Sequence, residues 1–174
     1  AAGAALAFSP TVQSLLAADS KSRFKIGACD WSIGKRLDLA AMEVAKRIGL
    51  DGVQVSFDAP GGRYDLRKAS VRQEYADAEK AHSVQIASLP MGVLNSRPYS
   101  SDPQTEQWVE ECVEVMAKMR QTIVLLAFFG KGDIKNKPGL QKEVIRRLKK
   151  VAPKAEKAGV TLALETWLSA DEHM

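Results

Sequence analysis

From residue 24 onward, short apolar runs alternate with longer amphipathic segments. Each of the five runs is typical of a strand, and the first four are each followed by a loop and by ten or more residues with helical periodicity. Regular alternation of this kind predicts βαβ units and therefore a parallel sheet covered by helices. The expected strands are 25–29, 52–56, 84–89, 122–128 and 160–164, and the expected helices are 39–48, 68–82, 105–120 and 139–158.

The ends of the predicted helices carry suitable capping residues. Gly49 follows the first helix and Gly159 the fourth, each directly ahead of a strand, as expected of left-handed C-caps. Residues 102–103 (Asp-Pro) supply an N-cap and a first-turn proline for the third helix. Ser169 and Glu172 have the spacing of a capping box, so we expect a fifth helix to begin there.

The spacing of the predicted strands along the sequence limits the possible folds. The predicted strands begin about 34 residues apart, so eight such units need roughly 270 residues, the size of a complete (β/α)₈ barrel. The 174 residues hold five strands and fit the first part of such a TIM barrel, truncated after about strand five. A doubly wound open sheet is the alternative, but CDWSIGKR after the first strand is not a glycine-rich phosphate loop.

The net charge of +4 raises the question of a nucleic-acid partner. The basic residues, for example those in 142–157, alternate with apolar positions and lack interleaved aromatic residues. This pattern is typical of a solvated outer helix face, so we expect no nucleic-acid partner. The two cysteines, Cys29 and Cys112, cannot form a disulfide framework and do not have the spacing of metal ligands. Both are expected to be buried and to act as small hydrophobic residues.

The first eighteen residues, AAGAALAFSPTVQSLLAA, carry no charge and end in small residues. They resemble the apolar region and cleavage zone of a secretory signal. We therefore expect residues 1–20 to be the remnant of an export signal, which implies a periplasmic or other extracytoplasmic location, and residues 21–174 to be the N-terminal part of one barrel domain. A disordered or helical extension and a membrane anchor are the alternatives, although a stable span needs about twenty uninterrupted apolar residues.

Candidate functional residues follow from the barrel, because its working side chains stand at the C-terminal ends of the strands. Glu165 closes the apolar strand VTLALE. A carboxylate there is costly unless it is protonated, paired or bound to a hard divalent cation. A glutamate that simply reaches solvent is the alternative. Six further residues follow predicted strands: Trp31, Phe57, Asn95, Phe129, Lys131 and Trp167.

Five segments resemble, in order, the sugar phosphate isomerase/epimerase family of the xylose isomerase-like TIM barrel superfamily. They are FKIGACDWSIG, GLDGVQVSF, ASLPMGVLN, IVLLAFFGKGDI and GVTLALETW. The resemblance covers residues 24–174 and only the N-terminal half of such a barrel. Members with a signal often carry a twin-arginine leader, and AAGAALAFSP looks like its apolar part.

The resemblance implies a divalent-metal-dependent isomerase or epimerase of a small sugar or sugar-like hydroxy-ketone, acting by proton transfer through an enediolate. Glu165 matches the strand-five glutamate that ligates one cation (Mn, Mg, Co or Zn) and serves as an acid/base, and the other ligands come from later strands. Substrate contacts are implied for Trp31, Phe57, Phe129 and Trp167 as apolar walls and for Asn95 and Lys131 as polar groups. Barrel-mouth packing and plain solvent exposure are the alternatives for these residues.

The chain also departs from relatives of this kind. Many carry an acidic residue at the end of strand two, where Gln54 and Ser56 stand, and many carry a histidine after strand three, where residues 89–91 read Leu-Pro-Met. A non-catalytic or defunct barrel that binds a carbohydrate and an inosose dehydratase-like lyase are alternatives. An endonuclease IV-like enzyme would need several histidine ligands, and the chain has only His82 and His173. The sequence leaves homo-oligomerisation open, and we expect the chain alone to be inactive and insoluble or molten.

Overall fold

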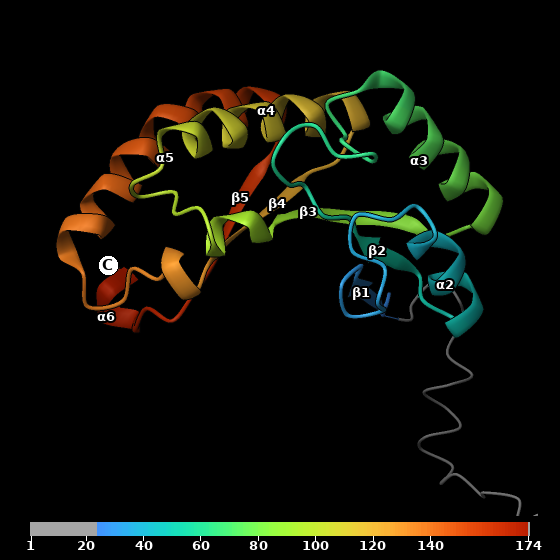
Figure 1. Cartoon of the computed structure of the whole chain (residues 1–174), viewed down its shortest axis with the longest axis horizontal. Helices are drawn as coiled ribbons and strands as arrows, with labels where there is room; N and C mark the ends of the chain where they lie inside the picture. Colours follow the sequence, from blue (N-terminus) through green and yellow to red (C-terminus); the bar gives the residue numbers. More distant parts are fainter. Residues whose placement is uncertain (1–23, 174) are drawn as a thin grey trace, which may run out of the picture.

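The computed structural model describes residues 24–173, so the predicted signal remnant, residues 1–20, lies outside the described part. Five strands form one parallel sheet in the order β1-β2-β3-β4-β5 (Figure 1). Because this order is also the chain order, every βαβ step advances in one direction around the sheet. A doubly wound sheet would reverse direction, and the prediction of a barrel-type fold is confirmed. The strands are β1 (Gly27–Cys29), β2 (Gly52–Gln54), β3 (Gln85–Met91), β4 (Ile123–Phe128) and β5 (Thr161–Thr166).

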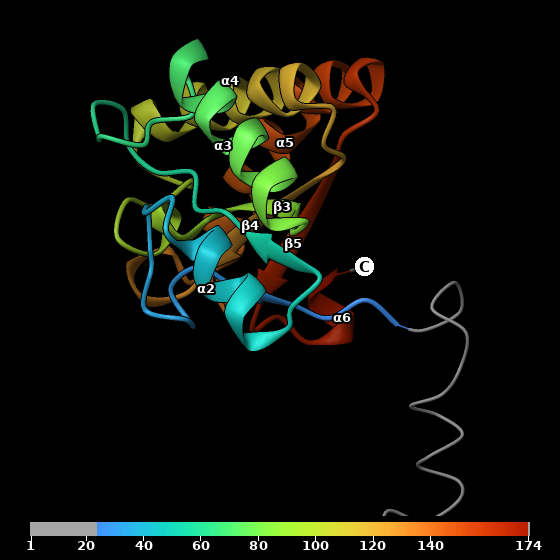
Figure 2. The same ribbon diagram turned by 90° about the vertical axis from the view of Figure 1, so that its right-hand side faces the viewer.

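The helices α2 to α5 form an arc along one side of the curved sheet (Figures 1 and 2). Two short 3₁₀ helices follow β3 and β4 at their C-terminal ends. Within the described residues, no helix is long and apolar enough to cross a membrane. The helices are α2 (Ala41–Ile48), α3 (Ala69–His82), η1 (Gly92–Asn95), α4 (Pro103–Met119), η2 (Gly130–Gly132), α5 (Pro138–Ala158) and α6 (Ala170–His173).

The predicted caps are present. Gly49 and Gly159 end α2 and α5 in the left-handed region, at φ 82° and 67°. The Asp102 side chain accepts the Gln104 N–H at 2.9 Å and so caps α4. The capping box at α6 is also confirmed, because Glu172 accepts the Ser169 N–H at 3.0 Å and donates its own N–H to the Ser169 hydroxyl.

The two faces of the sheet differ in residue type and in burial. On β4, the alternate residues Val124, Leu126 and Phe128 are at most 1% exposed and pack against the helices. Leu125 and Ala127 point to the other side, because successive side chains of a strand alternate between faces. The core therefore lies between sheet and helices, and the concave face lies opposite. Within residues 24–173, β1 pairs only with β2 and β5 only with β4, so both are edge strands.

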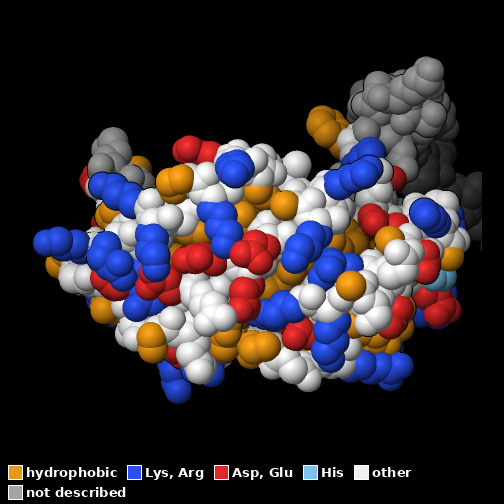
Figure 3. Space-filling view, turned by 90° about the horizontal axis from the view of Figure 1, so that it is seen from above, with side chains coloured by type: hydrophobic (Ala, Val, Ile, Leu, Met, Phe, Trp, Pro, Cys, Tyr) orange, Lys and Arg blue, Asp and Glu red, His pale blue; other side chains and the backbone are white. Residues whose placement is uncertain are grey.

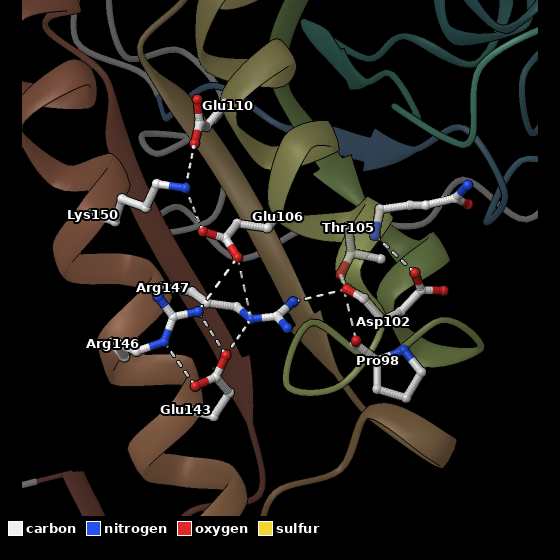
Figure 4. A network of polar contacts seen from close by, with 10 residues as sticks. Pro98, Asp102, Thr105, Glu106, Glu110, Glu143, Arg146, Arg147 and Lys150 are labelled. Atoms are coloured by element: carbon white, nitrogen blue, oxygen red, sulfur yellow. Dashed lines mark hydrogen bonds and ion pairs between the residues drawn. The ribbon is translucent and has the colours of Figure 1, made fainter.

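Helices α4 and α5 are joined by a set of ion pairs, here called the α4–α5 network (Figure 4). Its centre is Glu106, which accepts Lys150 Nζ at 2.7 Å and lies 3.6 Å from Arg147 Nε. Figure 3 shows acidic and basic side chains interspersed over this side of the molecule. Four basic residues of α5, Arg146, Arg147, Lys150 and Lys154, thus stand beside carboxylates. The network consists of Glu106, Glu110, Glu114, Glu143, Arg146, Arg147, Lys150 and Lys154.

Candidate active site

A cleft of about 400 Å³ lies where the C-terminal ends of the strands meet the concave face. Side chains and backbone from four strand–loop units form its wall. Such a volume falls within the range of small-molecule sites. The lining residues are Trp31 and Arg36 after β1, Pro90, Gly92 and Asn95 at the end of β3 and in η1, Leu125, Ala127 and Phe129 on and after β4, and Glu165 on β5.

Glu165 supplies the carboxylate of this cleft. Its Cα pairs with that of Ala127 on β4, so the two residues stand side by side on adjacent strands. The side chain is exposed, and it has no hydrogen bond or ion pair with any residue of the described part. The pKa of the Cys29 thiol is raised, chiefly by burial. The negative charges of Asp30 and Glu165 raise it further, which shows that Glu165 lies close enough to Cys29 to interact electrostatically.

Cys29 is half-buried on this face and donates its thiol to Gln54 Oε1 at 2.8 Å. The expectation of a buried hydrophobic cysteine is therefore confirmed for Cys112, which is 0% exposed, and is wrong for Cys29. The reason is that Cys29 faces the open concave side of the sheet, whereas Cys112 lies on the buried face of α4.

The loop after β1 is held in place by a buried carboxylate. Asp30 is 1% exposed, and its Oδ2 accepts the N–H groups of Leu37 at 3.1 Å and Ser56 at 2.9 Å. Its Oδ1 accepts the Ser56 hydroxyl at 2.8 Å. Leu37 takes φ 53°, which is uncommon for a residue with a side chain. The chain is thus folded back between residues 30 and 37, and this turn brings Trp31 and Arg36 to the cleft.

The loops after β3 and β4 support each other through Asn95. Its Oδ1 accepts the Phe129 N–H at 2.8 Å, which ties the end of η1 to the end of β4. Gly132 fits there because any Cβ would collide with the Leu94 carbonyl. The Phe129 ring lies 5.2 Å from the Trp167 ring, centroid to centroid, so the two rings extend one wall of the cleft towards β5.

The structure brings four of the seven predicted site residues to one cleft: Trp31, Asn95, Phe129 and Glu165. Trp167 does not line the cleft itself but packs against Phe129, which does, and it is 59% exposed. Lys131 is exposed on η2, outside the lining. Phe57 is 2% exposed in the core, with the Arg67 guanidinium 4.2 Å above its ring.

The sequence interpretation missed Arg36 and Gly92, which line the cleft. A signal for Arg36 was present, because it lies in the loop that follows the first strand, where barrels place working residues. Whether the Arg36 side chain points into the cleft, however, depends on the contact between Asp30 and Ser56, which are 26 residues apart in the sequence. Gly92 gave no chemical signal.

The described residues do not by themselves form a metal site. Within residues 24–173, no three His, Cys, Asp or Glu side chains stand close enough to hold an ion. Of the described residues, Glu165 alone offers a free carboxylate to the cleft, because the oxygens of the nearby Asp30 already accept three hydrogen bonds. His82 ends α3, on the opposite rim of the sheet from the cleft, and the side chain of His173 lies outside the described part.

Three solved structures of similar fold are each longer than this chain. A D-psicose 3-epimerase from Clostridium cellulolyticum H10, solved with D-tagatose, aligns with a TM-score of 0.63 at 15% identity over 86% of this chain and 57% of its own. A xylose isomerase-like TIM barrel protein from Mycobacterium smegmatis, in complex with magnesium, gives 0.62 at 15% identity over 81% and 54%. A sugar phosphate isomerase/epimerase from Parabacteroides distasonis gives 0.56 at 14% identity over 87% and 57%.

This chain therefore spans about half the length of the barrels it resembles. No curated protein sequence matches it. A family model described as "Xylose isomerase-like TIM barrel" matches residues 42–174, which is more than half of the chain. Together with the sheet order, this match shows that the chain belongs to the xylose isomerase-like TIM barrel family.

Proposed function

We propose that this chain carries part of the active site of an isomerase or epimerase that acts on a small sugar or a sugar-like hydroxy-ketone. The observation that supports this proposal is Glu165, a carboxylate without a hydrogen-bond or ion-pair partner in the described part, in a cleft walled by Trp31 and Phe129. An unpaired carboxylate can take up and release a proton. Aromatic rings favour the apolar faces of a sugar and keep water away from the reacting carbon.

The residues of the cleft suggest a division of labour. Glu165 takes the proton from the carbon next to the carbonyl group and, for isomerisation, returns it to the adjacent carbon on the same face. For epimerisation a second acid is needed to protonate the opposite face, and among the described residues that line the cleft Glu165 is the one acid/base group. Asn95 has its oxygen committed to the Phe129 N–H, so its NH₂ group is the part that can donate to a substrate hydroxyl. Trp31 and Phe129 hold the ring or chain of the substrate between them.

We also propose that Glu165 is one ligand of a divalent cation, Mn, Mg, Co or Zn. When bound, such a cation would polarise the substrate carbonyl and stabilise negative charge on its oxygen. The family match and the magnesium complex of the similar Mycobacterium protein support this proposal. Since the described residues supply a single carboxylate to the lining of the cleft, we expect the 174-residue chain alone to be inactive and to bind Mn²⁺ no better than its Glu165→Gln variant.

The test is proton exchange, measured with the full-length gene product that contains this chain. Ketoses are incubated in D₂O, and deuterium at the carbons next to the carbonyl is followed by NMR. We expect metal-dependent exchange that falls at least about 100-fold in Glu165→Gln, the usual contribution of a general base. Glu156→Gln is the matched control, because Glu156 is exposed on α5, far from the cleft.

Two results would change the assignment. Absence of exchange with a broad panel of ketoses, together with measurable sugar binding, would indicate a non-catalytic barrel that binds a carbohydrate. Loss of a hydroxyl group from a cyclitol or sugar as water, in place of exchange, would indicate a dehydratase-like lyase.

A further inference from the structure

Among the described residues, Arg36 is the one cation that lines the cleft, and its side chain extends from the loop after β1 towards Gly92 after β3. Its Nη2 would lie 4.0 Å from a Cβ at position 92, where Gly92 leaves that space open. Both Arg36 and Gly92 line the cleft that contains Glu165. The side chain of Arg36 is 49% exposed, so its guanidinium is accessible to a solute.

The guanidinium is held from two sides. Its loop is fixed by Asp30, which accepts the N–H of the neighbouring Leu37 at 3.1 Å. Its Nη2 donates to Asp58 Oδ2 at 2.7 Å. Within the described residues this is its one hydrogen bond, and a guanidinium has five N–H donors. The guanidinium of Arg36 is therefore held beside the cleft, and its remaining N–H groups can donate hydrogen bonds to a ligand.

We propose that Arg36 binds an anionic group of the substrate, a phosphate or a carboxylate, so that the substrates are acidic sugars or sugar phosphates. This inference rests on the proposed function, because it takes the cleft beside Glu165 as the substrate site. The planar fork of a guanidinium matches the paired oxygens of both anions, whereas a neutral sugar needs no cation. Glu165 would repel an anion placed beside it, so the anionic group binds at the Arg36 end and the reacting carbon lies near Glu165.

A purely structural role for Arg36 makes a different prediction. The Arg36 side chain is 49% exposed and that of Asp58 21%, and ion pairs at the surface add little stability. If Arg36 served only this pair, its loss would leave ligand binding unchanged. If it binds the substrate anion, its loss weakens only anionic ligands.

The experiment measures binding without turnover, on the full-length gene product. The probes are inorganic phosphate, followed by ³¹P NMR, and three ketoses that differ at carbon 6: D-fructose, D-fructose 6-phosphate and D-fructuronate. We expect phosphate and at least one anionic ketose to bind, and Arg36→Gln to weaken them about tenfold or more, as expected for a lost charge-assisted hydrogen bond. Binding of D-fructose should change less than about twofold, and Arg36→Lys should retain part of the anion affinity.

Arg47→Gln is the matched control, since it removes the same charge from the exposed last turn of α2. The phosphate and carboxylate ketoses tell which anion is preferred. Unchanged phosphate affinity in Arg36→Gln, no binding of any anionic probe, or an equal loss for charged and neutral ketoses would each overturn the proposal. None of these results depends on proton exchange, so they are distinguishable from failure of the catalytic assignment.

Discussion

Two glutamates, Glu106 on α4 and Glu165 on β5, have opposite surroundings. Glu106 accepts Lys150 Nζ at 2.7 Å and lies within 3.6 Å of Arg146 and Arg147 (Figure 4). The hydrogen bond from Lys150 lowers the pKa of Glu106. Glu165 has no such partner among residues 24–173, although it stands in a cleft.

The difference indicates what each carboxylate is for. A carboxylate surrounded by cations stays ionised and contributes to the contact between two helices. A carboxylate without partners contributes nothing to stability, and it remains available to a proton or a cation. A contrast in burial likewise separates the helix-covered face of the sheet, where Leu126 is 0% exposed, from the concave face, where the side chain of Glu165 is exposed.

The largest expected effect is on stability, and it compares the helix-covered and concave faces of the sheet with two neighbouring residues of β4. Leu126 is 0% exposed against the helices, whereas its neighbour Leu125 lines the cleft. We expect Leu126→Ala to lower the free energy of unfolding by about 2–5 kcal/mol, because it leaves a cavity in the core. Leu125→Ala removes the same atoms and should cost less than half as much. Urea denaturation of the full-length gene product measures both, and equal losses would contradict the assignment of faces.

Arg147 tests whether burial distinguishes members of the α4–α5 network. Its side chain is 8% exposed and donates to Glu143 Oε1 at 2.7 Å and to the Asp102 carbonyl at 2.8 Å. We expect Arg147→Met to cost about 2 kcal/mol, because it removes two hydrogen bonds of a buried guanidinium. Glu143 Oε1 then keeps the donor Arg146, and the Asp102 carbonyl keeps the Thr105 hydroxyl. Its neighbour Arg146 is 55% exposed, so Arg146→Met should cost about 0.5 kcal/mol. Thermal unfolding of the two variants compares them, and similar losses would show that the network acts only at the surface.

The pH dependence of the free energy of unfolding should reveal the ionisation of Glu106. The pKa of Glu106 is lowered below its ordinary value of 4.5, so the folded state prefers the ionised form. That contribution is present above pH 4.5 and is lost as the pH falls through the lower, folded-state pKa. We expect Glu106→Gln to cost about 0.5–1 kcal/mol at pH 7. The difference from the natural protein should shrink below pH 4.5.

Glu156→Gln provides the control for this experiment, since Glu156 forms no ion pair within residues 24–173. Its stability should follow that of the natural protein across the pH range. A constant difference between Glu106→Gln and the natural protein from pH 7 to pH 3 would show that the ion pairs of Glu106 do not set the acid sensitivity.

The order of elements could be predicted from the sequence because local signals mark it. Gly49 and Gly159 end their helices as expected, and the strand starts differ from the predicted ones by two residues or fewer. The left-handed caps at Ser83 and Arg120 gave no such signal, since neither residue is a glycine. There the packing of helix against strand imposes the conformation, and only the fold reveals it.

The candidate site was less predictable because it depends on register. Phe57 follows β2 and was expected at the mouth, but its N–H still donates to the Pro90 carbonyl at 3.0 Å. The strand pairing thus continues to residue 57, and alternation turns its ring into the core. Arg36 was missed for a related reason, because Asp30 directs its loop through contacts with residues distant in sequence.

The smallest expected effect on stability is the sharpest test of the contrast between the two glutamates. The side chain of Glu165 has no hydrogen bond or ion pair with the described residues, so Glu165→Gln removes no side-chain contact that holds the fold. We expect the free energy of unfolding of the full-length gene product, freed of metal with a chelator, to change by less than about 0.5 kcal/mol, as for other surface substitutions. The same substitution should remove proton exchange, whereas Glu106→Gln should lower stability and leave exchange intact. A loss of 2 kcal/mol or more in metal-free Glu165→Gln would show that this carboxylate has a structural partner, and its availability for chemistry would then be lost.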